Sequence, residues 1–271
     1  MRPAVLSSCP AARRVRVRRY LLITGAFCPL LLTANVLADN TISTIERVKG
    51  SVVAIGTLQP TRAPAFQFRA TGFAVGDGSL IATNAHALPT TLDSEHRETL
   101  VVLIPTADRQ SQVREARELV VDLGTDLAVL KMSGPPLRGL KLASADSVRE
   151  GQSVLFTGFP IGSVLGVFAA THRGMVAAIT PIVIPPPLAA QLDPRIVRRL
   201  TTGSFPVLQL DATAYPGNSG SPVYDPESGD VFGIINMVFV KGTKEAALTQ
   251  PSGITYAIPS HHLQSLLTKT N

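Results

Sequence analysis

Residues 215–222 read Tyr215-Pro216-Gly217-Asn218-Ser219-Gly220-Ser221-Pro222, which places one serine between glycines in a stretch of turn-forming residues. A tight turn of this kind leaves the Ser219 hydroxyl clear of the backbone. Neighbouring backbone N–H groups can converge on a substrate oxyanion there, because glycine has no Cβ to block the approach. The stretch therefore fits either acyl-transfer chemistry or a plain polar turn. A histidine and a carboxylate elsewhere in the chain must decide between them.

Both partners occur in suitable places. Two apolar runs, residues 72–75 and 79–83, flank Gly76-Asp77-Gly78 and predict a hairpin whose second strand ends at His86. Further on, Asp122 and Asp126 precede the apolar run 127–132. A buried aspartate at such a strand end can accept a hydrogen bond from an imidazole N–H. The residues alone leave both carboxylates open.

Three stretches follow one another in the order His, Asp, Ser: Thr83-Asn84-Ala85-His86, Thr125-Asp126-Leu127-Ala128-Val129-Leu130-Lys131 and Gly217-Asn218-Ser219-Gly220-Ser221-Pro222. They resemble the His, Asp and Ser motifs of trypsin-like serine peptidases, most closely those of the bacterial HtrA/Deg-like branch. Supporting matches occur at residues 45–55, 158–162, 173–176 and 254–259, in the family's order from about residue 41 to 267. The resemblance favours Asp126 over Asp122. The segment Gly220-Ser221-Pro222-Val223 also resembles glutamyl endopeptidases.

The resemblance implies a serine endopeptidase acting on proteins or peptides. In such an enzyme Ser219 attacks the carbonyl, His86 transfers the proton and Asp126 fixes the imidazole tautomer. Gly217, Asn218 and Ser219 would form the oxyanion hole. We expect no metal or cofactor. The remaining histidines, His96, His172, His261 and His262, are expected on the surface. The alternative is a non-catalytic binding or regulatory protein that retains the fold.

Substrate preference is predicted from the residue six before the serine. By resemblance Thr213 lies at the base of the primary pocket, where it offers no counter-charge to Lys or Arg. The pocket is expected to be lined by Tyr215, Ile235, Asn236, Met237, Val238 and Tyr256. These residues favour small or medium apolar side chains. A preference for acidic side chains, as in glutamyl endopeptidases, ranks second.

The recurrence of short apolar runs between turns predicts an all-β protein with two packed six-stranded antiparallel barrels and short peripheral helices. The first barrel is expected over about 51–134, with strands at 51–57, 72–75, 79–83, 99–104, 118–122 and 127–132. The second is expected over about 151–259, with strands at 153–158, 174–179, 207–211, 222–224, 231–237 and 255–257. His86 and Asp126 then lie on the first barrel and Ser219 on the second.

Two helices are predicted at the ends of this domain. Ile42, Ile45 and Val48 have the spacing of one face of an opening helix, and Ser260 is a candidate cap for a final helix over 260–268. In that final helix Leu263, Leu266 and Leu267 should pack inward. Little sequence follows Leu267, so we expect the peptide-binding PDZ domain of HtrA relatives to be absent.

Residues 1–38 are predicted to be a signal peptide. A basic start precedes an apolar run from Tyr20, which ends in Val36-Leu37-Ala38 before Asp39. Cleavage after Ala38 would leave residues 39–271 as one exported, periplasmic or secreted protease domain with no stable membrane insertion. The alternative is a retained anchor, although Pro29 and other residues interrupt the run.

Removal of the leader changes the charge argument. The chain has 25 Lys and Arg residues and 19 Asp and Glu residues, and the leader holds six of the basic residues and no acids. The exported part is therefore neutral overall, and we expect no nucleic-acid partner. Both cysteines, Cys9 and Cys28, leave with the leader. The resemblance suggests a homo-oligomer as a candidate assembly.

One region departs from a compact protease. Residues 181–205 are too long for a hairpin turn and too apolar for a free linker, so they are expected to form a partly helical insertion. Its arginines, Arg195, Arg198 and Arg199, would form either a solvated face or a contact for an acidic partner.

Overall fold

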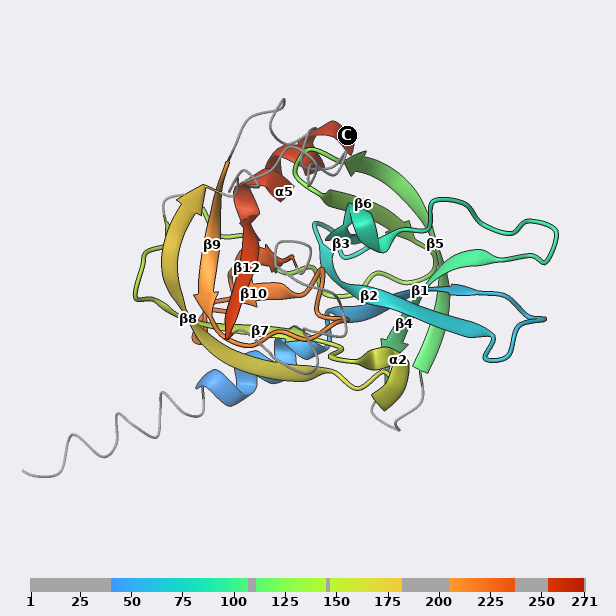
Figure 1. The fold of residues 1–271 in the computed structure, drawn as a ribbon, viewed down its shortest axis with the longest axis horizontal. Helices are drawn as coiled ribbons and strands as arrows, with labels where there is room; N and C mark the ends of the chain where they lie inside the picture. Colours follow the sequence, from blue (N-terminus) through green and yellow to red (C-terminus); the bar gives the residue numbers. More distant parts are fainter. Residues whose placement is uncertain (1–39, 107–110, 145–146, 182–204, 237–252, 271) are drawn as a thin grey trace, which may run out of the picture.

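The computed structural model describes residues 40–106, 111–144, 147–181, 205–236 and 253–270. Within these ranges twelve strands close into two antiparallel six-stranded barrels, which pack side by side (Figure 1). This confirms the predicted all-β fold class. The predicted insertion over 181–205 lies almost wholly outside the described residues.

The first barrel follows the strand order β1-β2-β3-β6-β5-β4. Its strands are β1 (Val52–Leu58), β2 (Phe66–Val75), β3 (Leu80–Asn84), β4 (Thr99–Pro105), β5 (Ser111–Asp122) and β6 (Leu127–Met132). All six were predicted, but β2 and β5 begin six and seven residues earlier than expected. The extra residues of β5 are mostly exposed and pair with β4, so apolar alternation does not reveal them.

The second barrel follows the order β10-β11-β12-β9-β8-β7. Its strands are β7 (Ser153–Gly158), β8 (Ala170–Pro181), β9 (Pro206–Asp211), β10 (Pro222–Tyr224), β11 (Val231–Ile235) and β12 (Ile254–Pro259). The loop between β9 and β10 carries Ser219. Its backbone carbonyl accepts the N–H of Thr71 on β2 at 2.9 Å, so Ser219 lies on the side of the second barrel that faces the first.

The segment that connects β6 of the first barrel to β7 of the second forms backbone contacts with both barrels. Leu140 forms a bridge with Val75 on β2, and Leu142 forms a bridge with Val231 on β11. The backbone N–H of Leu140 donates to Ala74 O at 2.8 Å. These contacts limit how far the barrels can move relative to each other, and so they help to fix groups that meet across the interface.

One apolar cluster spans the two barrels. Phe73 and Leu127 come from the first barrel, Tyr224 and Ile234 come from the second, and Leu263 comes from the C-terminal helix; none is measurably exposed. Burial of a large apolar side chain typically contributes about 1.5–3 kcal/mol. The interface is therefore part of the hydrophobic core.

The helices partly follow the prediction. Helix α5 (Ser260–Leu267) buries Leu263 and Leu266 and is followed by η5 (Thr268–Thr270). The predicted capping role of Ser260 is wrong, because its hydroxyl donates to Ala143 O at 3.1 Å. In the opening helix, residues 40–49, Val48 is buried as predicted, whereas Ile42 is 58% exposed. None of the helices in the described ranges is long and apolar enough to span a bilayer.

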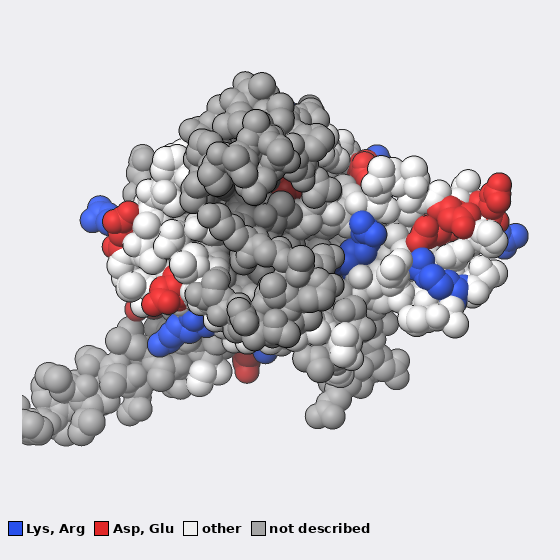
Figure 2. Space-filling view, viewed as in Figure 1, with Lys and Arg blue, Asp and Glu red and all other residues white. Residues whose placement is uncertain are grey.

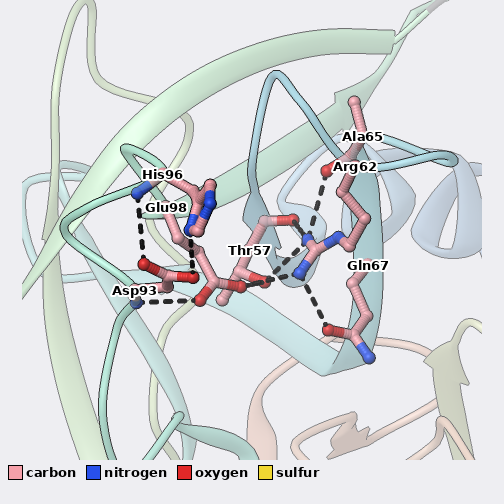
Figure 3. A network of polar contacts seen from close by, with 7 residues as sticks. All are labelled: Thr57, Arg62, Ala65, Gln67, Asp93, His96 and Glu98. Carbon is pink, nitrogen blue, oxygen red and sulfur yellow. Dashed lines mark hydrogen bonds and ion pairs between the residues drawn. The ribbon is translucent and has the colours of Figure 1, made fainter.

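The described surface in Figure 2 carries both charge signs. Lys and Arg side chains lie close to Asp and Glu side chains across that face. One polar network joins the β1–β2 hairpin to the loop before β4 (Figure 3). In this network Thr57 and Arg62 donate to the same Glu98 carboxylate oxygen at 2.5 and 2.8 Å.

Candidate active site

The predicted histidine and aspartate are brought together by the pairing of β3 with β6. His86 is in the short helix η1 (Ala85–Ala87), directly after β3. Asn84, the last residue of β3, pairs with Leu127, the first residue of β6. Asp126 precedes Leu127, so the register of this one strand pair places the two side chains next to each other.

Asp126 has a left-handed backbone with φ 58°, a conformation that aspartate tolerates better than most residues. Its backbone carbonyl accepts hydrogen bonds from the Asn84 side-chain amide and the Ala85 N–H, both at 3.1 Å. Its carboxylate oxygen Oδ1 accepts the His86 backbone N–H at 2.9 Å. The carboxylate is therefore held in one orientation relative to the imidazole.

The His86 ring lies between the carboxylate and the serine. Its Nδ1 is 2.6 Å from Asp126 Oδ2, and its Nε2 is 3.1 Å from Ser219 Oγ. Both distances are within hydrogen-bond range, and they give a continuous chain of contacts from carboxylate through imidazole to hydroxyl. Ser219 is 6% exposed, while the His86 side chain is 22% exposed.

Opposing effects act on the pKa of Asp126. Burial raises it, but the hydrogen bond and charge of the His86 ring, the His86 N–H and the Asn236 amide lower it. The net pKa of Asp126 lies below its usual value. The group is therefore a carboxylate at neutral pH and can stabilise a neighbouring imidazolium.

Asp122, the competing carboxylate, has a local role. Its Oδ1 accepts the backbone N–H groups of Gly124 and Thr125 at 2.9 and 3.4 Å. It closes the turn between β5 and β6, while the imidazole of His86 pairs with Asp126.

The Ser219 loop provides two backbone donors beside the hydroxyl. Among the described residues, the N–H groups of Gly217 and Ser219 have no backbone acceptor. The N–H of Asn218, which was also predicted in the oxyanion hole, donates instead to Tyr215 O at 2.9 Å. The candidate oxyanion donors are therefore those of Gly217 and Ser219.

The predicted pocket residues are only partly described. Thr213, Tyr215 and Tyr256 are all half-buried, whereas Met237 and Val238 lie outside the described residues. Asn236 is fully buried, and its side-chain amide donates to Asp126 Oδ2 at 2.7 Å. Its side chain therefore supports the carboxylate.

The expectation that the other histidines lie on the surface holds only for His96, which is exposed and pairs with Asp93. His172 is half-buried because it pairs across the sheet with Phe156, on which its ring stacks at 4.8 Å. His261 and His262 are also half-buried. No group of three or more His, Cys, Asp or Glu in the described ranges is arranged to hold a metal ion.

Two residues with contacts at this site were not predicted to have these contacts. Besides Asn236, Thr71 on β2 contacts the Ser219 loop through its backbone N–H and its hydroxyl. Thr71 and the Ser219 loop are far apart in the chain and come into contact only when the two barrels pack together. The sequence around Thr71 therefore gives no local signal for this contact.

The model of the trypsin-like peptidase domain matches residues 70–234, which include His86, Asp126 and Ser219. This chain belongs to that family.

Similar proteins include the "Probable periplasmic serine endoprotease DegP-like" of Pseudomonas fluorescens, at 28% identity over 189 residues, covering 69% of this chain and 32% of the relative. The protein of the same name from Marinomonas sp. is 28% identical over 197 residues, covering 72% and 34%. The chain thus spans about a third of the length of these curated relatives.

Solved structures share the fold. The crystal structure of Deg5 matches with a TM-score of 0.59 and 21% identity, covering 84% of this chain and 92% of that chain. The HtrA-type protease AlgW with tripeptide gives the same score and identity, covering 84% of this chain and 62% of the other. This likeness supports the two-barrel fold.

Proposed function

We propose that this chain is an exported serine endopeptidase that hydrolyses peptide bonds through an acyl-enzyme. The observation that carries the proposal is the position of the His86 ring, 2.6 Å from Asp126 and 3.1 Å from Ser219. Membership of the trypsin-like peptidase domain family and the similarity to DegP-like endoproteases support it.

In the proposed acylation step, Ser219 Oγ bonds to the substrate carbonyl carbon while its proton passes to His86 Nε2. The carbonyl π electrons move to oxygen and form a tetrahedral oxyanion. As this collapses, the C–N bond breaks and His86 returns the proton to the leaving amine. Asp126 keeps the proton on Nδ1 and stabilises the imidazolium. Water then repeats the sequence on the ester and releases Ser219.

The oxyanion would be stabilised by the N–H groups of Gly217 and Ser219. Loss of one such donor typically lowers the rate by about 10²–10³-fold. These donors are backbone groups, so they are positioned before substrate arrives. Apart from the substrate and the hydrolytic water, every reacting group in this scheme belongs to the chain.

We propose a preference for small or medium apolar side chains at the cleaved position. Thr213 carries no charge that would attract Lys or Arg. The second candidate is an acidic preference, because the His172 ring lies 6.5 Å from the ring of Tyr215. Burial lowers the pKa of His172, which leaves its imidazole neutral and less suited to an anion. The apolar preference is therefore placed first.

We further propose that residues 1–38 direct export and are removed after Ala38, which leaves the protein in the periplasm or secreted. The name of the DegP-like relatives contains the word periplasmic and is consistent with this. Substrates would be proteins or peptides, and a homo-oligomer is the proposed assembly. N-terminal sequencing of exported protein should begin at Asp39, whereas a start within the leader would contradict cleavage after Ala38.

Fluorophosphonate labelling tests the proposed activity. The wild-type protein should be labelled and should cleave an unfolded protein substrate, whereas Ser219→Ala should do neither. Ser265→Ala, at an exposed serine on α5, is the matched control and should behave as wild type. A folded wild-type protein that is neither labelled nor active would favour the non-catalytic alternative. Cleavage of a peptide library would distinguish apolar from acidic preference.

A further inference from the structure

Every backbone carbonyl of the Ser219 loop from Tyr215 to Ser219 accepts a hydrogen bond. In chain order the donors are Asn218 N–H at 2.9 Å, Ile161 N–H at 2.7 Å, Thr71 Oγ1–H at 2.7 Å, Ser221 N–H at 2.9 Å and Thr71 N–H at 2.9 Å. Three of the five bonds come from outside the loop. Two of these three come from a single residue of the other barrel, Thr71.

The hydrogen bonds that these carbonyl oxygens accept determine where the N–H groups of the candidate oxyanion hole point. In a trans peptide the C=O and N–H point in opposite directions. The carbonyl of Pro216 is held by Ile161, so the N–H of Gly217 points away from it. The carbonyl of Asn218 is likewise held by Ser221, which directs the N–H of Ser219. The Gly217 carbonyl lies between these two peptides and is held by the Thr71 hydroxyl.

The Thr71 hydroxyl also fixes the segment that holds Pro216. It accepts the backbone N–H of Phe159 at 3.1 Å while its own hydrogen is donated to Gly217 O. Phe159 is two residues before Ile161. The same hydroxyl therefore connects β2, the Ser219 loop and the segment after β7.

The hydrogen bonds of the Thr71 hydroxyl lie in a tightly packed region, where the backbone of the Ser219 loop has little room to move. Thr71 is fully buried, and its own carbonyl accepts the Thr83 hydroxyl at 2.7 Å. A Cβ built on Gly220 would lie 2.0 Å from Thr71 O, and one built on Gly217 would lie 2.3 Å from Phe159 O. The loop backbone is therefore packed directly against the backbone of Thr71 and of Phe159, whose N–H the Thr71 hydroxyl accepts.

We propose that Thr71 is a positioning residue of the oxyanion hole, because its hydroxyl holds the Gly217 carbonyl and the Phe159 N–H and thereby orients the two donor N–H groups. This inference rests on the proposed function. The hydrogen bonds of Thr71 to the Ser219 loop and to Phe159 are made to their backbone groups, whereas the Ser219 hydroxyl pairs with His86. Thr71 acts by orienting the peptide groups that carry the N–H of Gly217 and the N–H of Ser219.

The test compares Thr71→Val, which keeps the shape and removes the hydroxyl, with Thr71→Ser, which keeps the hydroxyl. Thr71→Val should lower kcat roughly 10- to 100-fold, less than the loss expected from deleting a donor, with KM changed by less than about 3-fold. Thr71→Ser should stay within about 3-fold of wild type.

Two further readouts separate positioning from general damage. A peptide boronic acid forms a bond from boron to Ser219 Oγ and places an oxygen in the oxyanion hole. Its affinity should fall by the same factor as kcat/KM in Thr71→Val. The acidic limb of the pH profile should not move, because the contacts of His86 are unchanged.

The matched control is Thr57 on β1, another buried threonine whose hydroxyl joins two segments, in the network of Figure 3. Thr57→Val should lower the melting temperature but leave kcat and boronate affinity per folded molecule unchanged. If Thr71→Val does not fold, Thr71→Ala removes the same hydroxyl without adding a methyl group.

The outcomes are distinct. Wild-type kcat and boronate affinity in a folded variant without the hydroxyl would overturn the proposal, and so would a tenfold or greater loss in Thr71→Ser. An inactive and unlabelled wild type would instead be a failure of the proposed function.

Discussion

The side-chain amide of Asn236 donates to Asp126 Oδ2 at 2.7 Å, and the same oxygen pairs with the His86 ring at 2.6 Å. Asn236 follows β11 of the second barrel, whereas Asp126 precedes β6 of the first. The second barrel thus supplies Ser219 and also supports the carboxylate behind the histidine. Any shift between the barrels would disturb both ends of this chain of contacts.

Asn236→Ala should therefore lower kcat about tenfold, well short of the roughly 10⁴-fold expected for Asp126→Asn, which favours the wrong imidazole tautomer. Asn236→Asp should be worse than Asn236→Ala, because a second carboxylate beside Asp126 replaces attraction by repulsion. Steady-state kinetics on a peptide substrate check the ranking. Equal kcat in wild type, Asn236→Ala and Asn236→Asp would contradict the proposed role of the Asn236 amide.

Gly217→Ala should reduce activity by about 10²-fold or more, because the new Cβ would lie 2.3 Å from Phe159 O and displace an oxyanion donor. Gly217 also has φ 104°, so backbone strain contributes. Gly151→Ala isolates that strain, since Gly151 has φ 83° and open space around it. The control should lose about 1–2 kcal/mol of stability and keep wild-type kcat. Comparable loss of kcat in both variants would exclude close approach as the cause.

The sequence predicts the fold well where burial creates a pattern. In β1, β6 and β11 nearly every residue is buried, and all three strands were predicted within one or two residues. The first half of β5 is mostly exposed and is held by backbone pairing with β4. Such a segment has no apolar period, so its start could not be found from composition.

In the candidate site, too, the sequence predicts the residues that have a local signal and misses the contacts that depend on tertiary packing. His86, Asp126 and Ser219 are in local motifs with recognisable neighbours, and the structure brings all three together. The contacts of Thr71 and Asn236 depend on how the two barrels pack. A polar residue in or beside an apolar strand gives no sign of a partner 110 or more residues away in the chain. His172 was also misjudged, because its stacking on Phe156 depends on strand register.

Glu98 should make stability depend on acid pH. Hydrogen bonds from Thr57, the Asp93 N–H and Arg62, together with the charge of Arg62, lower its pKa from 4.5 to about 2. The carboxylate therefore stabilises the fold above about pH 4.5, and this contribution is lost as the pH falls toward about 2. Glu98→Gln should be less stable than wild type at neutral pH, and the difference should shrink across that window.

Thermal unfolding at a series of pH values measures this difference. Glu46→Gln is the control, because Glu46 is exposed on the opening helix and should leave the pH dependence of wild type unchanged. A constant gap between wild type and Glu98→Gln from pH 7 to pH 2 would refute the assignment.

His262 should act over a higher pH range. Burial, and then the charge of His261, lower its pKa from 6.5 to about 4 despite the opposing effect of Asp122. The native state therefore binds fewer protons than the unfolded chain between these values. Stability is full above about pH 6.5 and falls as the pH drops toward 4. His262→Phe should remove this loss, so its stability relative to wild type should rise as the pH falls through that range.

A second substitution separates titration from packing. The His262 ring lies 4.6 Å from the ring of Phe205, and phenylalanine can keep this contact. His262→Gln removes both the titration and the ring. Its free energy of unfolding should be lower than that of His262→Phe at every pH, but it should show the same flattened pH dependence. Free energies of unfolding from urea titrations between pH 4 and 7 provide the measurement. If both variants keep the wild-type slope, the acid sensitivity arises from another group.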